Sequence, residues 1–393
     1  PLPDGGTLNS PYLHLSLPAA SGPRRYSAAL ESRLRAERVF SSTAAITASI
    51  TIRSGMNFEN LSIMSVRHVD APQIVTSSEI QSELGDTMER LGLPPNLLEG
   101  IAGIHERRYW NEQTLPSDAA TMAAEVALEE ADLDRARLGM LINTSVCRDF
   151  IEPSTACLVH GNLKLPDTCM NLDVGNACLA FLNGMEIVGN MIELGQIDYG
   201  MVVDGESSRF LIESTIERLK RPETDSKTFR EEFASLTTGS GAVAMILARS
   251  DLAPDGHQFR GTFSRAASEH NRLCLGQLDR GVTDTNGLLT AGVELSKTTF
   301  AGAQEHLGFD ESEVDEFCLH QVSQRHAEQL AKNLEIDLEK ALLIVDRFGN
   351  IGPASVPIVL SKAADLGRIQ RGNRVILAGI GSGLNCTVGE VIW

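Results

Sequence analysis

The stretch Asp173-Val174-Gly175-Asn176-Ala177-Cys178-Leu179-Ala180-Phe181 joins two kinds of sequence pattern. A strand-like run over 169–174 stops at a glycine, and a long apolar helical pattern begins at Cys178. Such a junction is typical of a layered α/β fold. A cysteine at a helix start also faces backbone N–H groups and the positive end of the helix dipole, which lower a thiol pKa. We therefore expect Cys178 to be a thiolate nucleophile, although a buried, inert cysteine is the commoner case for a single thiol.

Strand and helix signals alternate along the rest of the chain. Strand-like runs cover 138–144, 169–174, 199–204, 242–248, 314–320, 341–345, 374–380 and 386–392, and helical patterns cover 119–131, 180–194 and 325–334. Buried strands that alternate with helices predict a layered α/β architecture. The charge-rich stretch 213–232 predicts a surface helical insertion near the mouth of an active site or a dimer edge.

An internal repeat divides the chain into two halves. The run Leu194-Gly195-Gln196-Ile197-Asp198-Tyr199-Gly200 recurs as Leu366-Gly367-Arg368-Ile369-Gln370-Arg371-Gly372, and an apolar strand follows each copy. Cys178 lies 16 residues before Leu194, and Asn350 lies 16 residues before Leu366. A matched offset indicates a duplication. We predict halves at 56–225 and 226–393, with the two helix starts converging on one site.

Two further motifs carry polar residues that could serve chemistry. Phe317-Cys318-Leu319-His320-Gln321-Val322 is a short apolar strand that ends in histidine. Gly349-Asn350-Ile351-Gly352-Pro353-Ala354-Ser355-Val356-Pro357 is a turn-rich loop that leads into a helix. Taken alone, such a histidine is usually a hydrogen-bonded core residue and such an asparagine a helix cap or turn residue.

In this order, Cys178, His320 and Asn350 resemble the Cys-His-Asn set of the thiolase-superfamily condensing enzymes. Gly379-Ile380-Gly381-Ser382-Gly383-Leu384 resembles the glycine-rich terminal loop of the ketoacyl synthase III branch. The resemblance spans about 56–393. It implies a thiolase fold, with two duplicated α/β halves in a five-layer αβαβα arrangement, and a homodimer. It also implies an oxyanion hole made by the backbone N–H groups of Cys178 and Ser382.

Glu152 narrows the resemblance. Ketoacyl synthases carry an apolar residue before the Pro-Ser of the loop Asp149-Phe150-Ile151-Glu152-Pro153-Ser154-Thr155-Ala156. With Glu152 there, the chain resembles the OleA-type condensing enzymes, which open bacterial long-chain olefin biosynthesis. The alternative is a solvated loop carboxylate.

That resemblance implies a chemistry. Cys178 takes the acyl group of a first fatty acyl-CoA, and Glu152, reaching across a dimer interface, removes an α-proton from a second. His320 and Asn350 donate hydrogen bonds to the second thioester carbonyl. The product is a 2-alkyl-3-oxoalkanoic acid, formed by condensation without decarboxylation. A partly desolvated Glu152 would have a raised pKa, which suits a base.

The segment Gly103-Ile104-His105-Glu106-Arg107-Arg108 resembles the ketoacyl synthase segment that borders the pantetheine tunnel. We take Arg107 and Arg108 as candidates for binding coenzyme A, although such arginines more often form surface salt bridges. Ile101 stands where that branch often has an arginine. We expect no cofactor beyond the coenzyme A thioester substrates, and no metal site.

Composition excludes some classes of function. The net charge of −18 argues against a nucleic-acid partner, and we find no apolar run long enough to cross a membrane. The seven cysteines lack CxxC pairs, which favours a reducing compartment and a cytoplasmic enzyme.

The first 55 residues differ from the rest. They carry six arginines, no lysine and three acids, and only 44–52 resembles a strand. They could be disordered, a transit peptide or an upstream-extended start. We favour the last, because Met56 opens a segment that resembles the family's N-terminus.

Three other readings stay open. A decarboxylating ketoacyl synthase III would use a malonyl thioester, whose carboxylate a buried Glu152 would repel. A hydroxymethylglutaryl-CoA-synthase-like condensation also uses a cysteine and a glutamate. A non-catalytic paralogue would bind acyl chains as a dimeric partner, but such partners usually lose the nucleophile. Later olefin-pathway enzymes are plausible partners of an active enzyme.

Overall fold

The computed structural model describes residues 55–393. The predicted N-terminal extension and its strand-like run at 44–52 lie outside the described residues, apart from Gly55 at the start of the first strand.

The described chain alternates strands and helices, as expected from the sequence. The strands are β1 (Gly55–Asn57), β2 (Leu61–Asp70), β3 (Gln73–Thr76), β4 (Glu106–Tyr109), β5 (Met140–Asn143), β6 (Met170–Asp173), β7 (Tyr199–Glu206), β8 (Gly241–Arg249), β9 (His257–Ala266), β10 (Cys274–Gly276), β11 (Gly281–Thr283), β12 (Glu316–Leu319), β13 (Arg374–Gly381) and β14 (Asn385–Ile392). The α-helices are α2 (Ser77–Glu83), α3 (Gly85–Arg90), α4 (Leu97–Ala102), α5 (Pro116–Ala131), α6 (Thr155–Asn162), α7 (Ala180–Glu193), α8 (Arg209–Leu219), α9 (Ser226–Glu232), α10 (Thr285–Leu307), α11 (Gln324–Leu334), α12 (Val345–Phe348) and α13 (Ser355–Asp365).

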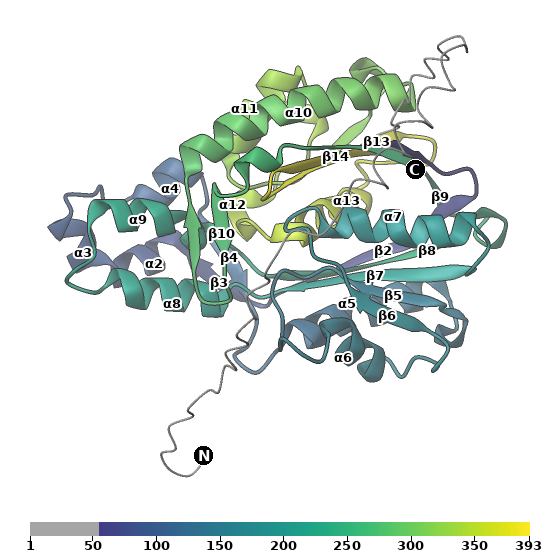
Figure 1. Ribbon diagram of the computed structural model, residues 1–393, viewed down its shortest axis with the longest axis horizontal. Coiled ribbons are helices and arrows are strands. Elements are labelled where there is room, and N and C mark those ends of the chain that lie inside the picture. Colours follow the sequence, from purple (N-terminus) through teal and green to yellow (C-terminus); the bar gives the residue numbers. More distant parts are fainter. Residues whose placement is uncertain (1–54) are drawn as a thin grey trace, which may run out of the picture. The chain divides into compact units, whose positions relative to one another are not determined.

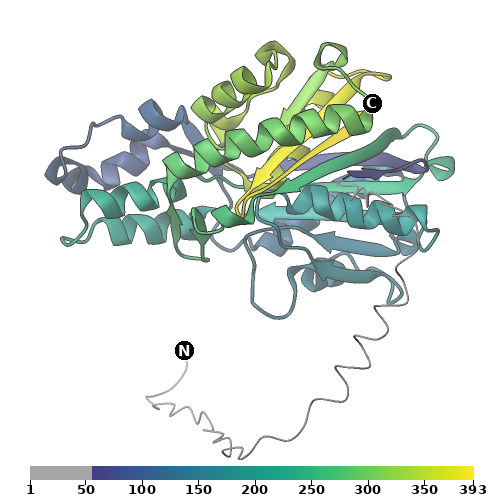
Figure 2. The same cartoon turned by 45° about the horizontal axis from the view of Figure 1, so that its top comes forward.

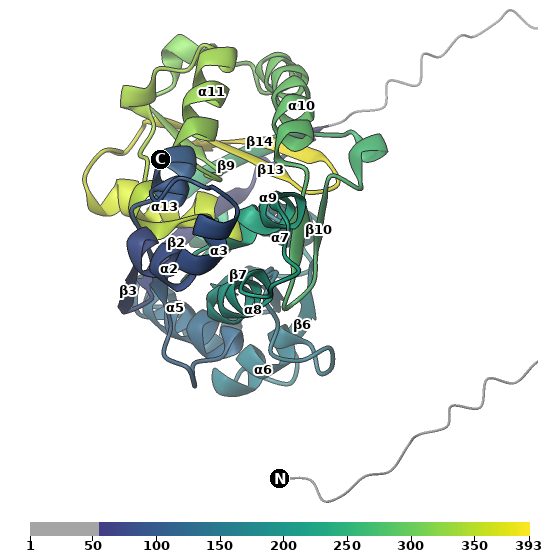
Figure 3. The ribbon, with the colours of Figure 1, turned by 90° about the vertical axis from the view of Figure 1, so that its left-hand side faces the viewer.

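Most strands belong to one mixed sheet, in which β2 connects one part, β8-β7-β5-β6, to another, β12-β13-β14-β9. Helices cover both faces of each part. The strand order is β12-β13-β14-β9-β2-β8-β7-β5-β6, with β1 attached to β9. Helices α7 and α13 lie between the two parts, α5 and α6 cover one outer face, and α10 and α11 cover the other (Figures 1 and 3). Figure 2 shows α10 as the green helix across the yellow strands β13 and β14. The predicted αβαβα layering is confirmed.

The internal repeat appears as two matching helix ends. Leu194 and Leu366 are the C-cap residues of α7 and α13, and the glycine after each has a positive φ, 65° at Gly195 and 68° at Gly367. Each copy then leads into a strand of eight residues, β7 or β13. The two central helices therefore end in the same way and are each followed by a strand, because a glycine in the left-handed conformation follows the C-cap residue of each.

Strand β2 connects the two parts of the sheet. It pairs antiparallel with β8 along most of its length, and with β9 at Ser62 and Ile63. Strand β8 follows residue 226 in the chain, yet it pairs with β2 and β7 rather than with the C-terminal strands. The sheet topology thus places β8 with the elements before residue 226.

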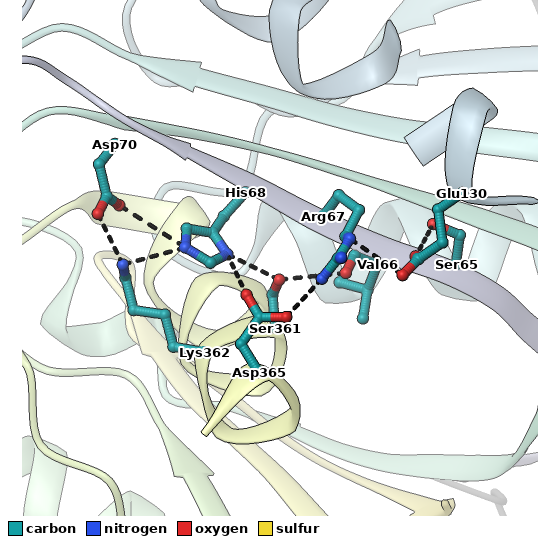
Figure 4. Close-up of polar contacts among 9 residues, drawn as sticks. All are labelled: Ser65, Val66, Arg67, His68, Asp70, Glu130, Ser361, Lys362 and Asp365. Carbon is teal, nitrogen blue, oxygen red and sulfur yellow. Dashed lines mark hydrogen bonds and ion pairs between the residues drawn. The ribbon is translucent and has the colours of Figure 1, made fainter. Parts of the chain in front are cut away.

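A polar cluster fastens the central helix α13 to β2 (Figure 4). The Nδ1 atom of His68 lies 2.7 Å from the hydroxyl of Ser361, and Arg67 forms ion pairs with Asp365 of α13 and, at 3.0 Å, with Glu130 of α5. Burial and Lys362 lower the pKa of His68. The cluster holds a central helix, an outer helix and the connecting strand in one arrangement.

The strand predicted at 341–345 is wrong. The backbone N–H of Leu342 donates to the Glu316 carboxylate at 2.8 Å, and those of Ile344 and Val345 donate to the Gln321 side-chain oxygen at 2.8 and 3.0 Å. Because buried side chains satisfy these N–H groups, the apolar run needs no neighbouring strand.

The charge-rich stretch 213–232 forms most of α8 and all of α9, as a helical insertion was predicted. Its apolar residues pack with α2 and α3 in a separate small core that includes Ile212, Ile216 and Phe229. In the part of the chain that the structure describes, no helix is both long and apolar enough to cross a bilayer.

Candidate active site

Three of the predicted site residues line one cavity of about 540 Å³: Cys178, Asn350 and Ser382. Cys178 comes from the junction of β6 and α7, Asn350 from the loop before α13, and Ser382 from the turn between β13 and β14. The helix starts of the two repeated halves therefore converge on one site, as the matched offset predicted.

A tight turn presents Cys178. Ala177 has a φ of 46°, a left-handed conformation that is uncommon for a residue with a side chain. The N–H groups of Leu179 and Ala180 donate to the carbonyls of Asn176 and Ala177, both at 3.1 Å, before α7 begins. The turn reverses the chain between strand and helix, so that Cys178 stands at the helix start and borders the cavity.

The glycine-rich turn at 381–383 packs directly on the turn at 176–180 that presents Cys178, which we call the nucleophile turn. A Cβ atom added at Gly381 would lie 3.0 Å from the Asn176 carbonyl oxygen and 3.4 Å from the Cys178 backbone nitrogen. Ser382 follows Gly381 and lines the cavity with Cys178. The two segments that would supply the oxyanion donors are therefore in contact, which is what two N–H groups aimed at one oxygen require.

Asn350 is held by its own backbone. Its N–H donates to the Thr237 carbonyl at 2.9 Å, and its carbonyl accepts from the Gly239 N–H at 2.8 Å. Its side-chain oxygen accepts from the Gly352 N–H at 3.0 Å. With that oxygen engaged, the Nδ2 amino group is the part of the side chain left to donate to a substrate in the cavity.

His320 lies at the end of β12, where its N–H donates to the Ala378 carbonyl of β13 at 2.8 Å. It is 2% exposed, and its Nδ1 atom has no partner among the described residues. Burial, with a smaller effect of His326, lowers the pKa of His320 to about 3. The imidazole is therefore neutral, with one nitrogen able to donate and the other to accept.

The predicted low pKa of Cys178 is wrong for this structure. Burial, then Cys274, Glu206 and Asp204, raise the pKa of the Cys178 thiol to about 12. A hydrogen bond from the backbone acts in the opposite direction but is the smallest of the causes. Desolvation of a charged thiolate outweighs the effect of the helix end on the pKa, which favours the thiol form of Cys178.

Glu152 is not brought to this cavity within one chain. It is exposed, in a loop between β5 and α6, and does not line the cavity. The loop nevertheless has a fixed end: Ser154 caps α6, and the N–H groups of Thr155 and Ala156 donate to Asp173 at 3.0 and 2.8 Å. The exposed Glu152 therefore lies on the surface of the molecule, close to the end of β6.

Arg107 and Arg108, the two coenzyme A candidates, do not line this cavity. Arg107 is fully buried, donates to Ser77 at 3.0 Å and to the Leu236 carbonyl at 3.2 Å, and has its pKa lowered to about 10 by burial. Arg108 pairs with Glu106 at 3.3 Å. Arg107 thus supports the fold through these two acceptors, and Arg108 forms an ion pair within its own strand, β4.

Two other arginines border the cavity. Arg148 is 41% exposed and lies 4.0 Å from Asp173, and Arg280 is 52% exposed and lies 3.0 Å from Glu232. Sequence reasoning missed both, since neither belongs to a motif. Their exposed guanidinium groups at the cavity border are suited to anionic phosphates.

Sequence reasoning also missed a buried carboxylate pair at the end of β7. Glu206 lines the cavity and accepts from the Val146 N–H at 2.5 Å, while Asp204 accepts from the Thr144 hydroxyl at 2.6 Å. Burial raises the pKa of both carboxyl groups. Glu206 thereby holds the first residues of the loop that leads to Glu152.

Comparisons with known proteins agree with this site. Residues 305–393 match the family model described as 3-oxoacyl-[acyl-carrier-protein] synthase III C terminal. The chain is 50% identical over 338 residues to the acyl-CoA:acyl-CoA alkyltransferase of Xanthomonas campestris, covering 86% of this chain and all of that protein. It is 36% identical over 350 residues to the enzyme of the same name from Shewanella oneidensis, covering 86% of this chain and all of the other.

The solved structures point to the same protein. Xanthomonas campestris OleA with bound cerulenin matches with a TM-score of 0.85, over 86% of this chain and 98% of that one. Further structures of that protein carry replacements of one glutamate, one cysteine and one histidine, and a cysteine-to-serine form holds lauric acid and lauroyl-CoA. Its replaced cysteine lies 26 positions after the glutamate and 142 before the histidine, which is the spacing of Glu152, Cys178 and His320. With half of its residues shared over the full length of such a relative, this chain belongs to the OleA family of acyl-CoA:acyl-CoA alkyltransferases, condensing enzymes of the thiolase superfamily.

Proposed function

We propose that this enzyme joins two long-chain fatty acyl-CoA molecules head to head, without decarboxylation, and releases a 2-alkyl-3-oxoalkanoic acid as the first step of long-chain olefin biosynthesis. The observation that carries the proposal is the single cavity that brings together Cys178, Asn350 and Ser382. The spacing shared with the residues replaced in Xanthomonas campestris OleA supports the roles of Glu152 and His320.

In the first half-reaction the Cys178 sulfur attacks the thioester carbonyl of one acyl-CoA. Because the pKa of the thiol is raised to about 12, its proton must leave as the new S–C bond forms. That proton ends on the departing coenzyme A thiolate, which leaves as the free thiol. The products are an S-acyl Cys178 and coenzyme A with a free thiol.

The negative oxygen that forms during this attack needs donors. The N–H groups of Cys178 and Ser382 belong to segments in contact, as the close approach of Gly381 to the nucleophile turn shows. Donors that are already in place cost no reorganisation during the reaction, and losing one typically slows such enzymes by about 100-fold or more.

In the second half-reaction Glu152 removes the α-proton of a second acyl-CoA. His320 and the Nδ2 group of Asn350 donate hydrogen bonds to the thioester oxygen of that second molecule as it gains enolate character. The resulting carbanion attacks the acyl carbonyl, forms the C–C bond and releases the Cys178 thiol. Hydrolysis of the remaining thioester by water gives the keto acid and a second free coenzyme A.

We propose that Glu152 acts in the cavity of a second copy of this chain. Ile151 is 90% exposed and Phe150 52% exposed on the same loop, so the loop presents apolar surface that a partner would cover. Strand β6 beside it is a sheet edge, and its residue Met170 is 53% exposed. An edge strand and an apolar loop on one surface suit a symmetric dimer.

The coenzyme A thioesters suffice as reactants, so we propose no further cofactor. We propose Arg148 and Arg280 as the residues that meet the coenzyme A phosphates, because they are the exposed arginines at the cavity border. We place the enzyme in the cytoplasm, where later pathway enzymes would consume the keto acid.

Mixed dimers test the proposal. Cys178→Ala and Glu152→Ala chains, each inactive alone, are refolded or co-expressed together and given lauroyl-CoA as sole substrate. If Glu152 acts across the interface, half of the dimers are mixed and each has one complete site, so about a quarter of wild-type ketone and keto acid returns. If the mixture stays inactive while wild type condenses, Glu152 acts within its own chain. If wild type forms no C–C bond until a malonyl thioester is added, the enzyme is a ketoacyl synthase.

A further inference from the structure

A chain of side-chain amides runs through the protein beside the nucleophile turn. Asn385 Nδ2 donates to Asn176 Oδ1 at 3.0 Å, and Asn176 Nδ2 donates to Asn183 Oδ1 at 2.7 Å. Asn183 Nδ2 then donates to Glu186 Oε2 at 2.8 Å, and the Thr262 hydroxyl donates to the other carboxylate oxygen at 2.7 Å. The four hydrogen bonds link β14, the nucleophile turn, α7 and β9.

The chemistry of Glu186 fixes the direction of this chain. An ionised carboxylate only accepts, so Asn183 must turn its amino group toward Glu186 and its oxygen toward Asn176. Asn176 must then donate to Asn183 and accept from Asn385. All three amides point the same way, and hydrogen bonds aligned in this manner polarise and strengthen one another.

The two members of the amide chain nearest the site, Asn385 and Asn176, belong to the two segments that would supply the oxyanion donors. Asn176 stands two residues before Cys178, and its carbonyl oxygen is the atom closest to a Cβ placed on Gly381. Asn385 is the β14 partner of Gly381 in the register of the two strands, directly after the turn that holds Ser382. The Asn385–Asn176 hydrogen bond therefore ties the nucleophile turn to the glycine-rich turn.

We propose that Asn385, Asn176, Asn183 and Glu186 form a positioning network that sets the separation of the Cys178 and Ser382 N–H groups. Of the four, Asn176 lines the cavity and the other three do not, and the network acts by holding the two segments in place. The network rests on the proposed function, because it acts through the oxyanion hole of the Cys178 acyl transfer. The network has a fixed donor-to-acceptor direction. As long as residue 186 is a carboxylate, every amide must donate toward it, and the opposite direction is not possible.

That polarity gives a reversal test. In Asn385→Asp the new carboxylate faces the Asn176 oxygen, acceptor against acceptor, and rotating the amides only moves the conflict to Glu186. In Glu186→Gln the side chain can still accept from Asn183, so the chain of bonds survives. In the double variant the glutamine can donate, all three links can reverse, and every contact again has one donor and one acceptor.

The measurement is single-turnover acylation of Cys178 by lauroyl-CoA, followed by intact-protein mass spectrometry. We expect Asn385→Asp to lower the maximal acylation rate by about 100-fold with little change in the half-saturating concentration, as loss of an oxyanion donor does. We expect Glu186→Gln to act within about threefold of wild type, and the double variant to recover at least about tenfold over Asn385→Asp. Asn190→Asp adds the same charge to α7 outside the amide chain and serves as the matched control, because Asn190 donates only to the Glu186 backbone carbonyl and the Met56 sulfur.

Each result decides one point. A double variant no faster than Asn385→Asp overturns the directional network, since a role in packing predicts no rescue. Should Asn385→Asp fail to fold, Asn183→Leu breaks the chain one link from the nucleophile turn and must lower the acylation rate at least about fivefold. If wild type itself is not acylated at Cys178, the proposed function fails; if wild type is acylated and all variants match it, only the network fails.

Discussion

Replacing Gly381 with alanine tests the contact on which the oxyanion hole depends. The added Cβ would lie 3.0 Å from the Asn176 oxygen, 3.3 Å from the Leu179 nitrogen and 3.4 Å from the Cys178 nitrogen. All three neighbours are backbone atoms of the nucleophile turn, which cannot rotate away as a flexible side chain would. The glycine-rich turn must therefore move away by a few tenths of an ångström.

The size of the effect follows from that shift. Complete loss of an oxyanion donor costs roughly 3–4 kcal/mol of transition-state stabilisation, and a hydrogen bond lengthened by a few tenths of an ångström loses part of this. We take about 1–2 kcal/mol, which corresponds to a rate reduced about 5- to 30-fold. Binding of acyl-CoA should change little, because the oxyanion exists only during the reaction.

The assay is the single-turnover acylation of Cys178, with thermal unfolding measured by circular dichroism as the control for folding. Gly161→Ala is the matched substitution, since a Cβ there meets no atom within 4 Å and the residue lies in helix α6, away from the cavity. We expect Gly161→Ala to acylate at the wild-type rate. A Gly381→Ala enzyme that is equally fast would show that the two turns are not held in contact, and the reasoning would be wrong.

Three further predictions concern single side chains. Because the pKa of Cys178 is raised to about 12, alkylation of its peptide by iodoacetamide should rise about tenfold per pH unit from pH 7 to 10, and a plateau near pH 7 would contradict a resting thiol. Arg107→Met should lower the free energy of unfolding by about 3 kcal/mol without changing the half-saturating acyl-CoA concentration. Arg148→Met should instead raise that concentration with little change in stability, because its only ion pair among the described residues, to Asp173, is 4.0 Å long; the opposite pattern would restore Arg107 as a ligand. Burial lowers the pKa of His326 to about 4, so the unfolded chain binds a proton at this histidine before the folded protein does, and stability falls as the pH drops from about 6.5 to 4. His326→Asn should reduce the pH dependence of the free energy of unfolding over that range by up to about 1.4 kcal/mol per pH unit. An unchanged pH dependence in denaturant unfolding would refute this.

The local motifs explain why much of the site could be predicted from the sequence. Cys178, Asn350 and Ser382 each stand in a short segment whose glycines and apolar residues encode a turn, and all three line the cavity. The repeat located the two central helices, because it includes the glycines that close them. The Asn385–Asn176 bond joins residues 209 positions apart, and no local pattern indicates it.

Burial explains the predictions that failed. The helix start indicated a low thiol pKa, but the sequence does not show that the thiol lies inside a cavity near Glu206 and Asp204. Arg107 sits in a motif associated with coenzyme A, yet it is fully buried against carbonyl acceptors. The apolar run at 341–345 does not form the predicted strand, because the side chains of Gln321 and Glu316 accept hydrogen bonds from its backbone N–H groups. In each case atoms from distant parts of the chain decided the outcome.

The bond between Asn176 and Asn385 also has a consequence for biosynthesis. A ribosome that adds 5–20 residues per second needs roughly 10–40 s to make the 209 residues between them. Throughout that time the nascent chain already carries Cys178 but lacks the turn that, in our proposal, completes the oxyanion hole. We therefore expect acyl transfer to Cys178 to become fast only after the strand containing Asn385 has been translated and has folded into the sheet.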